Sequence, residues 1–311
     1  MYLAKEQINI VDNLDFFARQ VVEGFLTGLH KSPYHGFSVE FAEHRLYNTG
    51  DSVKNIDWKL FARSDRLFVK KFEDETNLRS HILLDTSSSM LYPRESIASS
   101  KNNKVNKLSF SLYASACLIN LLHRQRDGFG LTFYNEKIDL FTRSRSGKAH
   151  YNRLMSELDK KISNNQHDEN KKTNFASIVS DLIEKIHQRS LIIIFSDMFN
   201  FEDSNATWFE ALQHLKYRKN EIILFHVQDR QYEKLLNFSN QPHEFIDLEN
   251  NSRIKLNPNN YKEIYQKKYS SFQKELELKC GHYNIDYVPA FIQDGFSKVL
   301  LSYLTKRSKI I

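Results

Sequence analysis

The stretch ILLDTSSS at residues 82–89 and the stretch IIIFSD at residues 192–197 decide the expected fold. Each opens with an uninterrupted apolar run and reaches an aspartate, Asp85 or Asp197, where that run ends. A short apolar run without alternation is typical of a parallel strand that is covered on both faces. The two runs therefore predict an α/β protein with a buried, mostly parallel sheet.

The segments around these two runs alternate between strand and helix patterns. Strands are predicted at 81–85, 128–134, 138–141, 190–196, 221–227 and 285–288, with a further edge strand at 244–248. Helices are predicted within the first 30 residues and at 104–126, 150–161, 173–188, 206–219, 259–280 and 295–306. Because strands alternate with helices of ten or more residues, we expect βαβ units and a doubly wound sheet, as in Rossmann-like folds.

The length of 311 residues allows one large domain or two modest ones, and a 41% hydrophobic content is enough for a real core. The character of the sequence changes near residue 80. We expect residues 1–79 to form an N-terminal segment, a helix plus strands, that packs on a main domain at 80–311. A strand is predicted in this segment at 67–73.

Composition excludes several classes of protein. The longest apolar runs are far shorter than the ~20 residues that a bilayer span needs, and the N-terminus lacks a secretory apolar region. Two cysteines cannot form a disulfide scaffold. We therefore expect a cytoplasmic protein without membrane contact. The net charge of +6 permits nucleic-acid binding, but the sequence contains no motif that supports it.

Oxygen-bearing side chains gather at the carboxyl ends of the two central strands, where ligands bind in such sheets. They are Asp85, Ser87 and Ser89 after the first strand, Asp197 after the second, and Thr173 at the start of a predicted helix. Carboxylates and hydroxyls suit Mg²⁺ or Mn²⁺ rather than Zn²⁺. In the alternative interpretation, Asp85 caps the following turn and Thr173 is the N-cap of its helix.

This pattern, Asp-x-Ser-x-Ser followed by Thr and Asp, resembles the metal-ion-dependent adhesion site of von Willebrand factor type A domains. The resemblance covers about residues 80–308. It implies that Ser87, Ser89 and Thr173 bind the metal ion and that Asp85 and Asp197 act mainly through water. It also implies that an open coordination position accepts a Glu or Asp of a protein partner.

A second resemblance lies upstream, in RLYNTGDSVKNIDWKLFAR at residues 45–63 and VKKFE at residues 69–73. These stretches are similar to the signature of the bacterial family called "domain of unknown function 58". That family implies a partnership with a MoxR-type AAA+ ATPase. One departure is the pair Lys171-Lys172 before Thr173, where the family often has glycine.

The sequence thus predicts a non-enzymatic, Mg²⁺-dependent binding module whose partner offers an acidic residue. One alternative is a metal-dependent phosphatase with Asp85 as nucleophile, but that chemistry needs a second acid two residues later, where Ser87 stands. The other alternative is a nucleic-acid-binding protein, and only the excess of basic over acidic residues favours it.

Overall fold

A computed structural model describes residues 13–30, 44–46, 58–64, 66–70, 78–93, 105–163, 175–198, 201–249 and 251–310. The chain divides into two compact units, one of residues 26–77 and one of residues 1–25 together with 78–311. In the smaller unit, strand β1 (His44–Leu46) pairs antiparallel with β2 (Phe68–Lys70), and α2 spans Trp58–Ser64. The division predicted from the sequence, 1–79 and 80–311, stays a prediction.

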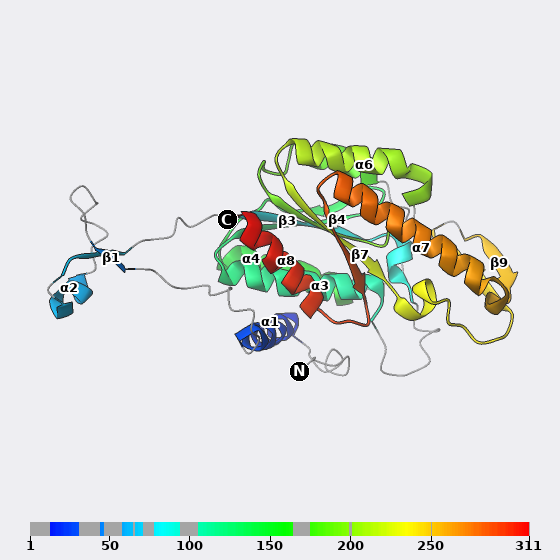
Figure 1. The fold of residues 1–311 in the computed structure, drawn as a ribbon, viewed down its shortest axis with the longest axis horizontal. Helices are drawn as coiled ribbons and strands as arrows, with labels where there is room; N and C mark the ends of the chain where they lie inside the picture. Colours follow the sequence, from blue (N-terminus) through cyan, green and yellow to red (C-terminus); the bar gives the residue numbers. More distant parts are fainter. Residues whose placement is uncertain are drawn as a thin grey trace. The chain divides into compact units, whose positions relative to one another are not determined.

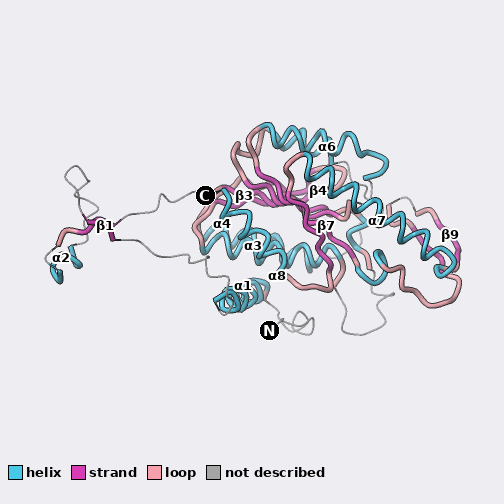
Figure 2. Tube along the Cα trace, in the orientation of Figure 1, coloured by secondary structure: helices cyan, strands magenta, loops and turns pink. Residues whose placement is uncertain are grey.

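A six-stranded sheet forms the centre of the larger unit (Figure 2). Its order is β10-β7-β6-β3-β4-β5, and every neighbouring pair is parallel except β4 and β5. The strands are β3 (Arg79–Asp85), β4 (Gly128–Tyr134), β5 (Ile138–Phe141), β6 (Leu191–Ser196), β7 (Glu221–Gln228) and β10 (Asp286–Phe291). The predicted α/β class with a mostly parallel sheet is therefore confirmed.

Helices cover both faces of this sheet, so its central strands carry apolar side chains on both faces (Figure 1). One layer holds α5, α6 and α7, and the other holds α3, α4 and α8. Their bounds are α3 (Lys107–Arg124), α4 (Lys148–Ser163), α5 (Phe175–Ile183), α6 (Phe201–Tyr217), α7 (Pro258–His282) and α8 (Ser297–Ile310). Among the described helices, none has the length and apolar character that crossing a bilayer requires.

Helix α1 (Leu14–His30) confirms the helix predicted near the N-terminus and joins the layer of α3. The Phe17 ring packs edge-on against Tyr113 of α3, with ring centroids 5.0 Å apart, and against Phe296 at 5.7 Å. The Tyr151 hydroxyl donates to the Asp15 carboxylate. Apolar packing and one partly buried polar contact thus fix the first turns of α1.

The predicted edge strand at 244–248 differs from the structure. Strand β8 (His243–Ile246) pairs antiparallel with β9 (Arg253–Leu256) in a separate two-stranded sheet, away from the central one. In β9 the charged Arg253 and Lys255 alternate with Ile254 and Leu256, and Glu244 of β8 lies opposite Lys255. Because this pattern leaves one face polar, the pair does not require cover on both sides, unlike the strands of the central sheet.

Gly130 in β4 lies where no side chain fits. A Cβ there would stand 2.6 Å from Nδ1 of His81 and 2.8 Å from the carbonyl oxygen of Thr142. The His81 ring is held in place, because its Nε2 lies 2.8 Å from Oγ1 of Thr132. At Gly128, on the same strand, the nearest atom would be 3.6 Å from the added Cβ, which is ordinary contact.

We expect Gly130→Ala to lower the free energy of unfolding by about 1–3 kcal/mol, because overpacking strains the neighbouring backbone. Gly128→Ala is the matched control and should cost clearly less. Urea denaturation of both variants measures the difference. Equal stabilities would show that β4 can move away from His81 and Thr142, contrary to the packing described above.

Candidate functional site

Asp85 and Asp197 follow two strands that are neighbours in the sheet. Strands β3 and β6 are parallel, and Leu84 lies opposite Phe195 in their register. The Ser196 hydroxyl bridges the strand ends by donating to Oδ2 of Asp85 at 2.9 Å. The two aspartates predicted from the sequence therefore lie at one edge of the sheet, and both are buried.

Ser87 and Ser89 turn back over the end of β3. A short 3-10 helix, η3 (Ser88–Leu91), begins directly after the strand. The Ser87 backbone N–H donates to Oδ1 of Asp85 at 2.9 Å, and this contact holds the turn against the strand end. The hydroxyl oxygens of Ser87 and Ser89 lie 3.0 Å apart, and both residues are buried.

Thr173 lies outside the described residues, and helix α5 begins at Phe175. Its contribution to the site therefore stays a prediction. Of the other four residues of the predicted set, Asp85, Ser87 and Ser89 are joined by hydrogen bonds, and the Ser196 hydroxyl connects Asp85 to the strand end that carries Asp197.

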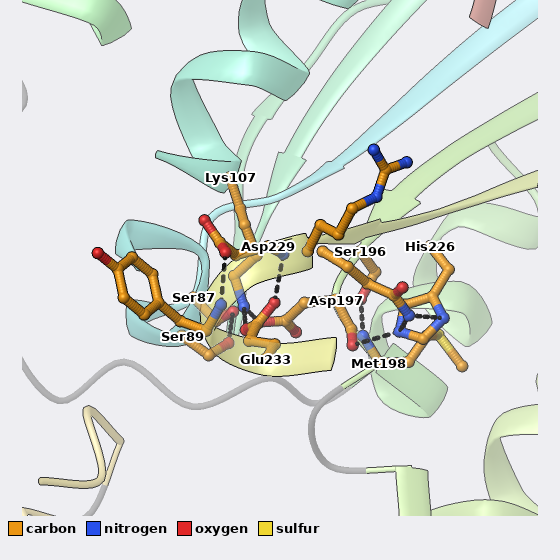
Figure 3. Close-up of polar contacts among 12 residues, drawn as sticks. Ser87, Ser89, Lys107, Ser196, Asp197, Met198, His226, Asp229 and Glu233 are labelled. Carbon is orange, nitrogen blue, oxygen red and sulfur yellow. Dashed lines mark hydrogen bonds and ion pairs between the residues drawn. The ribbon is translucent and has the colours of Figure 1, made fainter. Parts of the chain in front are cut away.

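A buried lysine that the sequence analysis missed completes the cluster. Lys107 is the first residue of α3, and its side chain is 1% exposed. Its Nζ lies 2.7 Å from Oδ2 of Asp197 and 2.5 Å from Oε1 of Glu233 (Figure 3). Burial alone would lower the pKa of Lys107, but the charges of Asp197 and Glu233 outweigh it and raise this pKa, so the group is an ammonium.

Glu233 reaches the cluster from a third strand end. It lies in η4 (Arg230–Lys234), one turn of π-helix directly after β7, and such turns are frequent at functional sites. The Asp229 backbone N–H donates to Oε2 of Glu233 at 2.7 Å, which leaves Oε1 for Lys107. The Asp229 carboxylate in turn caps the turn by accepting from two of its backbone N–H groups.

Two contacts fix the position of Asp197. Met198 adopts a positive φ of 55°, which bends the chain sharply after Asp197, and its N–H donates to the Ser196 hydroxyl at 3.1 Å. From β7, Nε2 of His226 lies 3.0 Å from the backbone oxygen of Asp197. Burial lowers the pKa of His226 to about 4, with Asp197 opposing the change, so the ring is neutral. Because a carbonyl oxygen can only accept, Nε2 is the donor in this contact.

The electrostatics at Asp85 differ from those at Lys107. Burial raises the pKa of Asp85 to about 7, and the charge of Asp197 adds to the rise. Hydrogen bonds from Ser87 and Ser196 act in the opposite direction. A positive charge placed near these carboxylates would therefore stabilise the ionised form of Asp85.

Both missed residues had a signal in the sequence. Lys107 lies four residues before Ser111 and seven before Ala114, so it shares the buried face of a helix that was otherwise recognised as apolar. Asp229 and Glu233 follow the predicted strand 221–227, just as Asp85 and Asp197 follow theirs. Applying the strand-end rule to this third strand would have found Glu233.

The donor set of the cluster is compatible with a small, hard cation. Adjacent oxygen ligands of an octahedral Mg²⁺, each roughly 2.0–2.1 Å from the ion, lie about 2.9 Å apart. The Ser87 and Ser89 hydroxyls are hydrogen-bonded to each other with their oxygens 3.0 Å apart, and this separation is also close to that spacing. Within the described ranges, no group of three or more His, Cys, Asp or Glu residues is arranged to hold a metal. An ion at this site would therefore depend on the serine hydroxyls.

A protein-family model matches most of the chain. The profile described as "Protein of unknown function DUF58" matches residues 43–275. The chain belongs to this family. The match begins in the smaller unit and includes Lys107, Glu233 and all five residues predicted for the site.

Relatives of this DUF58 protein include three proteins of Mycobacterium bovis and Mycobacterium tuberculosis that are named as uncharacterized. Each is 31% identical over 77 residues, which is 25% of this chain and 24% of the relative. The chain thus matches about a quarter of the length of these curated relatives.

Two solved structures resemble the chain at 13% identity. One is a conserved hypothetical protein, BatB, of Bacteroides thetaiotaomicron, with a TM-score of 0.45 over 75% of this chain and 99% of that one. The other is an aerotolerance-related membrane protein of Bacteroides fragilis, with a TM-score of 0.42 over 74% and 99%.

We expect Lys107→Ala to lower the free energy of unfolding by about 3 kcal/mol in metal-free buffer, because it leaves buried carboxylates without their counter-charge. The control is Lys160→Ala, which removes an exposed ion pair with Glu157 and should cost less than about 1 kcal/mol. Urea denaturation in the presence of a chelator measures both. A cost for Lys107→Ala no greater than that of the control would contradict the buried ion pair.

Proposed function

We propose that this protein is a non-enzymatic adaptor that acts in the cytoplasm and binds an acidic residue of a protein partner through Mg²⁺ or Mn²⁺. The observation that carries the proposal is the pair of serine hydroxyls, 3.0 Å apart, beside the buried carboxylates of two adjacent strand ends. Together with Thr173, these residues follow the order of the metal-ion-dependent adhesion site in von Willebrand factor type A domains.

Each residue has a distinct task in this proposal. Ser87, Ser89 and Thr173 would hold the ion. Asp85 holds the serine turn through the Ser87 N–H, and with Asp197 it supplies the negative charge that favours a cation. Burial of these side chains strengthens the electrostatic interactions of the cluster. A bound Mg²⁺ would supply the positive charge and the open position that a partner carboxylate needs.

The proposed partner is a MoxR-type AAA+ ATPase, and the proposed role is protein remodelling or complex assembly. Membership of the DUF58 family supports this choice, because the family signature is what implies the ATPase. A protein partner also suits the chemistry of the site, because the carboxylate of a Glu or Asp side chain can coordinate a metal ion without a covalent step.

The phosphatase alternative is less well supported. The position two residues after Asp85 holds Ser87, which cannot protonate a leaving group as a carboxylic acid would. The Lys107 ammonium, which lies beside the site, bonds to Asp197 and Glu233. We therefore assign Asp85 a structural and electrostatic role rather than a nucleophilic one.

The test is affinity capture from a lysate of the source organism, with the tagged full-length protein as bait. We expect the bait to retain a partner in Mg²⁺ and to lose it in EDTA. The double variant Ser87→Ala/Ser89→Ala should reduce retention by about tenfold or more, because it removes two ligands of the ion. Mass spectrometry identifies and quantifies the partner.

The matched control is Ser80→Ala/Ser115→Ala, which also removes two buried hydroxyls but lies outside the site. Neither hydroxyl has a hydrogen-bond partner among the described residues. This control should bind like the unchanged protein. Retention that persists in EDTA and in the Ser87/Ser89 variant would exclude the metal bridge.

A further inference from the structure

A positive charge already occupies the neighbourhood of the proposed metal site. The Lys107 ammonium lies 2.7 Å from Oδ2 of Asp197, and both side chains are nearly inaccessible to solvent. Figure 3 shows Lys107 and Asp197 in the same cluster as Ser87 and Ser89. One of the two carboxylates that would favour a cation is thus already neutralised by the protein itself.

Two cations at one carboxylate oppose each other. Counter-ions and water screen charges poorly where solvent is excluded, so the repulsion between the ammonium and a divalent ion is stronger here than at the surface. The coupling is reciprocal. The Lys107 ammonium weakens the binding of the metal ion, and a bound metal ion weakens the Lys107–Asp197 ion pair by the same free energy.

We propose that Lys107 is a built-in competitor of the metal ion for Asp197, and that it sets how tightly the site binds divalent cations. The proposal deepens the proposed function, since it rests on a metal site at Ser87 and Ser89. The pair Lys107–Asp197 is one state of the site. In the other state the metal ion interacts with the Asp197 carboxylate, and the Lys107 ammonium pairs with Glu233 only.

Glu233 is placed to hold the ammonium in the second state. Its Oε1 lies 2.5 Å from Nζ of Lys107, while Oε2 is anchored by the Asp229 N–H. The Tyr265 hydroxyl from α7 donates to the Glu233 backbone oxygen at 2.5 Å. With a side chain 24% exposed, Glu233 is also the member of the ion-paired trio that lies nearest to solvent. The Lys107 ammonium therefore still has a counter-charge, that of Glu233, when the metal ion interacts with Asp197.

The chain offers a matched control at the opposite end of the sheet. Lys306 also bridges two carboxylates, with Nζ 2.8 Å from Glu221 and 3.0 Å from Asp286. Those residues begin strands β7 and β10, whereas Glu233 follows the end of β7. Lys306→Met removes the same charge as Lys107→Met, but away from the proposed site.

The experiment is calorimetric titration of the full chain with Mg²⁺, and with Mn²⁺ as a second probe. We expect Lys107→Met to lower the dissociation constant by about tenfold or more, because it removes the competing charge. Lys306→Met should leave the constant unchanged. Lys107→Arg keeps the charge and should bind as weakly as the unchanged protein.

A measurement on the unchanged protein covers the case in which Lys107→Met does not fold. The ¹H–¹⁵N signal of the Lys107 ammonium should shift on addition of Mg²⁺, while that of Lys306 stays in place. If the metal binds with equal affinity with and without Lys107, or if it binds and the Lys107 signal does not move, the competition is wrong and the proposed function stands. If neither the unchanged protein nor any folded variant binds either metal, both proposals fail.

Discussion

The buried ion pair between Lys107 and Asp197 is the contact on which the arrangement of the site depends. It joins the first turn of α3 to the end of β6, across 90 residues of sequence, and Glu233 extends it to the turn after β7. Such a pair adds little net stability, but removing one partner is costly because the other charge stays buried. The pair therefore restrains three elements whose ends meet at one edge of the sheet.

The strand order brings the predicted residues to one edge of the sheet, and a series of contacts holds them there. The chain bends at Met198, directly after Asp197, and the Met198 N–H donates to the Ser196 hydroxyl, which in turn donates to Asp85. Asp85 in turn holds the turn that carries Ser87 and Ser89. The carboxylates thus organise the hydroxyls, and the hydroxyls are the groups whose spacing suits a small hard cation.

The inner strands β3, β6 and β7 were predictable because burial on both faces leaves a continuous apolar run, which half-exposed strands do not carry. Asp85 and Asp197 were predictable for the related reason that ligands gather at strand ends. The helical spacing of Lys107 places it on the buried face of α3, but its role was not recognised, because the Asp197 carboxylate with which it pairs lies 90 residues away in the sequence. Strand β9 was missed because its sequence RIKL is only four residues long and largely exposed, so its alternation is too short to indicate a strand.

The central claim is that the Ser87 and Ser89 hydroxyls hold a divalent ion beside these carboxylates. Diffraction from crystals grown with Mn²⁺ tests it most directly, because the anomalous signal locates the ion without reference to the protein density. We predict a peak within bonding distance of both serine hydroxyls, with the Lys107 ammonium drawn towards Glu233. An anomalous map with no peak at these serines, from crystals saturated with Mn²⁺, would contradict the claim.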